Sequence, residues 1–263
     1  MAISGWANAD DEDPTSVDLD APLGVVEKET ESTEVEAGNP SDPTASVKYT
    51  DLRYRYLDLG GDADRNWLTV EGGLMVSPKI KLIYELHFWE SDISGSSESN
   101  FESAHLKGIY ISKPRRLTDK IGYKVVAGVE LIANLGDFSD GTGSGAHQVA
   151  PFGGVAWSLP RKNTLITLAQ YFGSVHEDSD AGDISTTALR VIWLKQLPHK
   201  MWIRVDEKFF INHERSGSTS NTIEFQLGKT INRKFGIYGD LLYQTGGYQQ
   251  YDWGLGIGAR FMY

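Results

Sequence analysis

The sequence predicts an all-β protein: an antiparallel, up-and-down transmembrane β-barrel of about 12 strands that follows a disordered acidic tail. Three observations lead to this prediction. Apolar and polar residues alternate in most segments after residue 46. The connections between these segments alternate between short and long. The aromatic residues gather near the segment ends, as in barrels that cross a bilayer.

The N-terminal region, residues 1–46, is predicted to be disordered. Residues 10–46 are acidic, rich in Pro, Ser, Thr and Glu, and almost free of aromatic residues. Such a segment buries too little apolar surface to offset the entropy that ordering would cost. Two roles remain open, a solubilising leader and an arm that binds a partner. Residues 7–9 (Ala-Asn-Ala) have the small-x-small form of a cleavage site, so residues 1–9 are either a signal-peptide remnant or a chance match.

Residues 47–263 are predicted to form the barrel, because their alternation places one residue set on each face of a strand. The predicted strands are 47–59, 67–77, 80–91, 101–112, 121–135, 149–159, 164–174, 184–197, 201–212, 222–231, 236–244 and 251–263. Glu207 lies on an otherwise apolar face and would meet lipid unless a bulge turns it inward.

The connections support an up-and-down barrel, in which short periplasmic turns alternate with longer external loops. The turns are 77–79, 160–163, 198–200 and 232–234, with a longer one at 113–120, and the loops are 91–100, 137–148, 176–183, 212–221 and 246–250. An even number of strands returns both termini to the periplasmic side.

The aromatic residues form two expected belts, one near each headgroup region. The belt beside the long loops contains Tyr54, Tyr56, Trp67, Phe88, Phe101, Tyr171, Phe209, Tyr243, Tyr251 and Trp253. The belt beside the short turns contains Tyr110, Tyr123, Trp157, Trp193, Trp202, Tyr238, Phe261 and Tyr263.

The last strand alternates strictly, with one apolar face and one face of glycine and charge. Its end, Gly256-x-Gly258-x-x-Phe261-x-Tyr263, resembles the signal that bacterial outer-membrane β-barrels present to their assembly machinery. This resemblance implies membership of that superfamily, a location in the bacterial outer membrane, and the membrane lipid and barrel-assembly machinery as partners. No narrower family is indicated.

The composition excludes several classes of protein. A formal net charge of -11 argues against a nucleic-acid partner, which would require clustered Lys and Arg. The absence of cysteine excludes disulfides and thiolate metal sites. No apolar run is long enough for a transmembrane helix, which needs about 20 residues.

With the apolar faces toward lipid, the opposite faces give a lumen lined by both signs of charge, which is expected to be largely paired. The predicted lining consists of Arg53, Arg55, Glu71, Lys81, Glu85, His87, His105, Lys107, Lys124, Glu130, Arg190, Arg204, Asp206, Lys208, Glu224, Asp240, Asp252 and Arg260. Matching apolar faces across the hairpins predicts four directly opposite pairs: Glu85 with Lys107, His87 with His105, Lys208 with Glu224, and Asp206 with Gln226.

The predicted function is a narrow, charge-lined channel for small polar solutes. The alternative is a non-conducting barrel that anchors the acidic tail, which then binds a periplasmic partner or plugs the lumen. Mixed charge favours no particular ion selectivity.

We expect no enzymatic activity and no cofactor. The local combinations of His105 with Ser103 and His213 with Asn212 lack the surrounding residues of a known hydrolase. Glu85, His87 and His105 are candidate ligands for a divalent metal, but a solvated or salt-bridged pair in the lumen is the favoured interpretation. Residues 178–183 have oxygen ligands spaced as for calcium but lack a terminal Glu, so a polar loop is favoured there.

Overall fold

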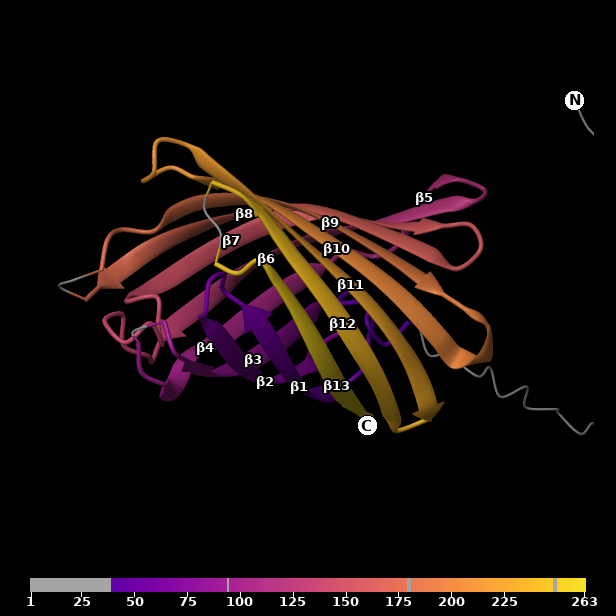
Figure 1. Cartoon of the computed structure of the whole chain (residues 1–263). Coiled ribbons are helices and arrows are strands. Elements are labelled where there is room, and N and C mark those ends of the chain that lie inside the picture. Colours follow the sequence, from indigo (N-terminus) through magenta and orange to yellow (C-terminus); the bar gives the residue numbers. More distant parts are fainter. Residues whose placement is uncertain (1–38, 94, 179–180, 248–249) are drawn as a thin grey trace, which may run out of the picture. The chain divides into compact units, whose positions relative to one another are not determined.

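The computed structural model describes residues 39–93, 95–178, 181–247 and 250–263. This part of the chain forms a closed 12-stranded antiparallel barrel, whose strands wind obliquely around its axis (Figure 1). No helix in the described part is long and apolar enough to cross a membrane. The strands are β1 (Tyr49–Asp58), β2 (Asp64–Ser77), β3 (Ile80–Ser91), β4 (Glu98–Ile111), β5 (Arg115–Thr118), β6 (Ile121–Asn134), β7 (Ala146–Leu159), β8 (Asn163–Glu177), β9 (Ser185–Gln196), β10 (Met201–Asn212), β11 (Ser218–Asn232), β12 (Phe235–Gly246) and β13 (Trp253–Met262).

The barrel closes through two pairings between strands that are not consecutive in the sequence. β1 pairs with β13 along its whole length, from Tyr49 opposite Met262 to Asp58 opposite Trp253. β4 pairs with β6, and the short strand β5 continues the line of β4 beside the start of β6. Closure leaves no edge strand in the ring, so the backbone hydrogen bonds are satisfied within the sheet, as a hydrocarbon environment requires.

The predicted fold class is confirmed, and so is the number of strands that span the barrel. The predicted strands 80–91 and 201–212 have the same bounds as β3 and β10. Several others are longer than predicted: β11, for example, begins at Ser218 and reaches into the expected loop. β5 lies within the connection predicted at 113–120.

The two faces of the sheet differ as the alternation predicts. In β13, Leu255 and Ile257 are 52% and 69% exposed, whereas the intervening Gly256 is buried and Arg260 is 5% exposed. The same contrast runs through β12, where Leu241 is 52% exposed and Asp240 is 4% exposed. Large apolar side chains therefore cover the outside of the barrel, and the polar faces line the inside.

Glu207 is an exception on the outer face. The register of β10 with both neighbours is continuous at this position, so no bulge turns the side chain inward. Its carboxylate instead accepts a hydrogen bond from Asn221 Nδ2 on β11 at 3.1 Å. A neighbouring amide therefore solvates the charge in place of an inward rotation.

Three residues that were assigned to the aromatic belts are turned into the barrel. Trp202 is 1% exposed, and its indole donates to Gln226 Oε1 at 3.2 Å. Tyr238 is 5% exposed, with its hydroxyl 3.2 Å from an Asp51 oxygen. Trp67 packs edge-on against His87. The assignment of these residues to the belts was wrong, because each ring has a polar partner or a packing partner inside the barrel.

Part of the interior is apolar. Ile83, Ile109, Ile111 and Val126 form one buried cluster that Phe152 contacts. A second cluster contains Ala156, Ile166, Ile192 and Leu194, with Leu168 packed against it. These positions show that the inner face of β8 carries Ile166, Leu168 and Gln170.

Candidate functional site

The candidate site is the charged inner face of the barrel. Every residue of the predicted lumen lining except Asp252 lies on the less exposed face of its strand. Asp252 lies just before β13 and is exposed. Its carboxylate lies beside Gly60, in the connection between β1 and β2. Its assignment to the lining was therefore wrong, because the strand begins two residues later than predicted.

Residues 39–46 contact the inner wall, so the disorder expected for residues 1–46 does not extend to them. Lys81 donates from Nζ to the carbonyl oxygens of Pro43 and Ala45, at 3.1 and 2.9 Å. Ser41 donates to Gln226 Oε1 at 2.8 Å, and Arg260 donates to the Pro40 carbonyl. Polar partners inside the barrel thus replace the apolar burial that this segment lacks. Residues 1–38 lie outside the described residues.

The segment enters at the end of the barrel that carries the short turns and the C-terminus. Lys81 is the second residue of β3, close to the turn at 77–79, and the Tyr263 amide donates to the Lys48 carbonyl at 3.2 Å. Arg260 also binds Asp51, with Nε 2.6 Å from Oδ1. One end of the lumen is therefore occupied by residues 39–46.

A first ion-pair group joins β1, β11 and β12. Arg55 Nη2 lies 2.5 Å from Glu224 Oε2 and 3.0 Å from Asp240 Oδ2. Gln226 donates to the other Asp240 oxygen at 2.9 Å. The Asp240 side chain is 0% exposed, so its charge is compensated by direct contacts rather than by bulk water.

A second group joins β9 and β10. Arg190 binds Asp206 through two nitrogens, Nε at 2.7 Å and Nη2 at 2.5 Å, and Arg204 contacts the same carboxylate. Asp206 is directly opposite Glu224 on β11. This juxtaposition brings the second group beside the first and makes one continuous charged wall.

A third group lies on β3, β4 and β6. Lys107 Nζ contacts Glu85 Oε1 at 2.9 Å and Glu130 Oε1 at 3.2 Å. Glu130 also accepts from Gln170 Nε2 at 2.7 Å. His105 Nδ1 lies 2.8 Å from Glu130 Oε1. Glu85 also contacts His87, so each Glu of this group has at least two polar partners.

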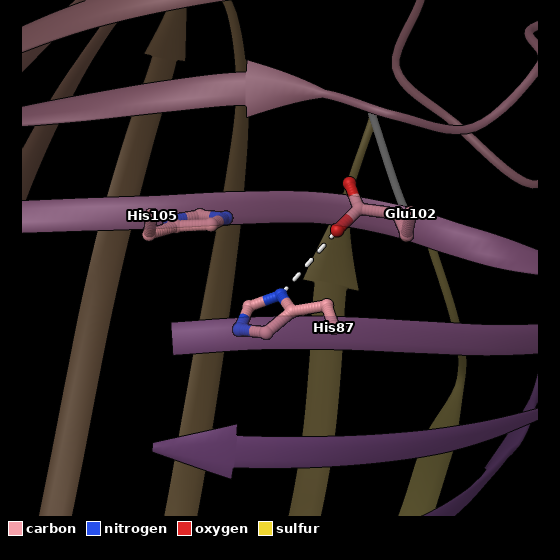
Figure 2. Close-up of side chains that lie close together, drawn as sticks. All are labelled: His87, Glu102 and His105. Carbon is pink, nitrogen blue, oxygen red and sulfur yellow. Dashed lines mark ion pairs between the residues drawn. The ribbon is translucent and has the colours of Figure 1, made fainter. Parts of the chain in front are cut away.

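His87 and His105 stand next to each other, with their ring centroids 4.5 Å apart. His87 Nδ1 lies 3.3 Å from Glu102 Oε2, and its Nε2 lies 3.1 Å from Glu85 Oε2. Figure 2 shows His87, Glu102 and His105 converging from the neighbouring strands β3 and β4. They are the one group found in the described residues whose ligand atoms all lie within 4.8 Å of one another, close enough to hold a metal ion.

The contacts of His105 and His213 bear on the two hydrolytic combinations, His105 with Ser103 and His213 with Asn212. Ser103 Oγ lies 2.7 Å from His105 Nε2, which gives a Ser–His–Glu chain of contacts ending at Glu130. Ser103 is 1% exposed, however, and contacts the Glu102 carboxylate. An adjacent carboxylate opposes the oxyanion of an acyl-transfer transition state. His213 contacts Thr187 Oγ1 rather than Asn212. The calcium-like loop contains residues 179–180, which lie outside the described residues.

The predicted cross-strand pairs are displaced by two residues. Glu85 is opposite His105, and His87 is opposite Ser103. In the same way, Lys208 is opposite Thr222 and Asp206 is opposite Glu224, while Gln226 faces Arg204. A shift of two keeps every side chain on its predicted face, so Lys107 still reaches Glu85 diagonally.

Sequence reasoning missed two important acids. Asp51 alternates with Arg53 and Arg55 on β1, so its spacing already indicated the inner face. Glu102 is different, because strict alternation from Ser103 directs it outward. A register shift between His87 and Phe88 on β3 leaves Glu102 without a direct partner and turns it inward. No sequence signal predicted that bulge.

Tyr251 lies in the connection between β12 and β13, at the opposite end from residues 39–46. Burial raises the pKa of its phenol to about 12, although the nearby Arg55 acts in the opposite direction. The Tyr251 side chain is accordingly half-buried.

Comparisons with solved structures identify the architecture. A NanC porin aligns with a TM-score of 0.59 at 13% identity, covering 81% of this chain and 98% of the porin. An outer membrane channel from Pseudomonas putida F1 also gives a TM-score of 0.59, at 10% identity, covering 83% of this chain and 96% of the channel. The chain has the fold of an outer-membrane β-barrel. A KdgM porin aligns with a TM-score of 0.54 at 9% identity, covering 82% of this chain and 99% of the porin.

These similarities confirm the predicted barrel fold. No protein-family model matches the chain, and no curated protein sequence matches it either.

Proposed function

We propose that this protein is a bacterial outer-membrane channel through which small polar solutes pass along a narrow, charge-lined lumen. The fold shared with the NanC and KdgM porins supports a channel. The low exposure of the lining charges, 2% for the Asp206 side chain and 19% for that of Lys107, supports a narrow path.

One observation carries the proposal of a hydrated path. Arg53 Nε, Arg204 Nε and Glu224 Oε1 are buried polar atoms without a hydrogen-bond partner in the described part of the chain. All three groups influence one another electrostatically. Buried polar atoms in native proteins are almost always satisfied, by water where no protein group is available. These atoms therefore favour a water-filled centre over a fully interlocked one.

The positions of Lys48 and Tyr263 support a proposed orientation of the barrel. Lys48 and Tyr263 lie side by side at the end with the short turns. Short turns face the periplasm in outer-membrane barrels, so we propose that both termini, and the acidic residues before 39, lie on that side.

A second candidate function rests on residues 39–46, which bind Lys81, Gln226 and Arg260 inside the barrel. This contact favours a plugged barrel that holds the acidic tail near a periplasmic partner. In that case the lumen would conduct only after residues 39–46 leave it.

Single-channel recording in planar bilayers tests both candidates. The channel proposal predicts small, steady current steps from the full chain, with weak ion selectivity because both signs of charge line the path. A variant lacking residues 1–46 should give larger steps, since it frees one mouth of the lumen. Silence from the full chain together with steps from the truncated chain supports the plug. Silence from both, with heat-modifiable barrels present, contradicts a channel.

A further inference from the structure

We propose that His87, Glu102 and His105 form a binding site for a first-row divalent cation, best suited to Zn²⁺, in the wall of the lumen. Two imidazoles and one carboxylate are a common ligand set for zinc, with the fourth position left to water. The site is independent of whether the lumen conducts.

The ligand atoms already converge. His87 Nδ1 and Glu102 Oε2 are 3.3 Å apart, close to the separation of about 3.4 Å that tetrahedral bonds of about 2.1 Å require. The whole set lies within 4.8 Å, so the widest separation between ligand atoms needs to shorten by about 1.4 Å to complete the geometry.

A serine hydroxyl marks the point of convergence. Ser103 Oγ lies 2.7 Å from His105 Nε2 and 3.4 Å from His87 Nδ1, and it also contacts Glu102. A polar atom therefore stands where the three ligand atoms meet. Rotation of the serine to another staggered position clears this point for an ion.

The far side of each imidazole is the second, independent observation. His87 Nε2 lies 3.1 Å from Glu85, and His105 Nδ1 lies 2.8 Å from Glu130. Imidazoles that bind metals almost always donate their other N–H to such a partner, which orients the ring and increases its basicity. Here both rings have a carboxylate in this position, and the other nitrogen of each ring faces the Ser103 hydroxyl.

The charge of the group also favours a dication. The contacts join three carboxylates, those of Glu85, Glu102 and Glu130, to one ammonium, that of Lys107. With neutral imidazoles this group carries two excess negative charges. A divalent cation compensates both charges. It also provides a direct counter-ion for the Glu102 carboxylate, which the bulge turns inward.

A histidine pair elsewhere in the barrel provides a matched control. His147 and His176 are stacked with their ring centroids 5.9 Å apart, yet they belong to no metal-competent group in the described part of the chain. Two stacked imidazoles are therefore not enough, and the carboxylate ligand distinguishes the proposed site.

The test is calorimetric titration of the full chain, refolded in detergent and freed of metal, with Zn²⁺ alone. We expect one equivalent to bind to the unaltered protein and to His147→Gln. Binding should be lost in His105→Gln and Glu102→Gln. Glu130→Gln should bind about 10- to 100-fold more weakly, as expected for a residue that orients a ligand. No stoichiometric binding, or binding that survives in His105→Gln and disappears in His147→Gln, overturns the proposal.

A measurement on the unaltered protein does not depend on whether the variants fold. X-ray absorption at the zinc edge should show two imidazole ligands and one carboxylate, with oxygen in the remaining position. A first shell with one imidazole or none contradicts the assignment even if zinc binds.

Discussion

Replacing Asp206 with asparagine removes the carboxylate that Arg190 and Arg204 share. The side chain of Asp206 is 2% exposed, and it accepts two hydrogen bonds from Arg190 at 2.7 and 2.5 Å. Asparagine has nearly the same shape, so the packing is preserved. What changes is the charge, because the two guanidinium groups then face each other without the carboxylate that they share.

Breaking a buried ion pair by removing one partner costs about 3–5 kcal/mol. With two cations deprived of their shared partner, we expect Asp206→Asn to lower the free energy of unfolding by about 3 kcal/mol or more. At about 1.4 kcal/mol per tenfold change, this corresponds to a fall of roughly 100-fold or more in the folding equilibrium constant. The exposed Asp119, in the turn after β5, is the control: Asp119→Asn should change stability by less than about 0.5 kcal/mol.

Urea-induced unfolding in lipid vesicles, followed by tryptophan fluorescence, measures these changes. The double variant Asp206→Asn/Arg190→Gln restores part of the charge balance. It should therefore lose less than the two single variants combined, with a coupling of about 1–3 kcal/mol. A loss below about 1 kcal/mol for Asp206→Asn, or strict additivity in the double variant, would refute the interpretation of this group as a buried, mutually dependent network.

Three further variants test other parts of the barrel. A Cβ on Gly228 would stand 2.1 Å from the Trp202 ring, so Gly228→Ala should displace the indole and cost about 1–3 kcal/mol in urea unfolding. Ile257 is 69% exposed in the middle of β13; Ile257→Arg should cost about 2–4 kcal/mol in vesicles, whereas Leu117→Arg on the short β5 should cost about 0–1 kcal/mol. Equal costs at the two positions would contradict the lipid-facing assignment. With the pKa of Tyr251 raised to about 12 by burial, Tyr251→Phe should leave the phenolate absorbance unchanged up to about pH 11 and lower it above that pH.

The faces of the strands could be predicted from the sequence because alternation depends only on the local period of two. For the same reason Arg55, Asp206 and Asp240 were assigned to the inner face. The residue opposite each charge was not predictable, because loops of unknown conformation set the register, and both tested hairpins were displaced by two positions.

The parts of the site that escaped prediction depend on tertiary context. Glu102 faces inward only because of a bulge, and a single inserted position leaves no pattern in the sequence. Trp202 and Tyr238 have residue types that suit a membrane belt equally well as an interior hydrogen bond. The contacts of residues 39–46 with Lys81 and Arg260 are made by backbone carbonyls, which carry no sequence information.

Spin labels along β12 test the central claim most directly, namely that the apolar face meets lipid and the charged face lines the interior. The chain contains no cysteine, so one introduced cysteine at each position from 237 to 242 gives a unique label. In lipid vesicles, accessibility to oxygen should peak at 237, 239 and 241, where Ile237 and Leu241 are 47% and 52% exposed, and fall at 238, 240 and 242. Uniform accessibility, or maxima at the even positions, would contradict the account.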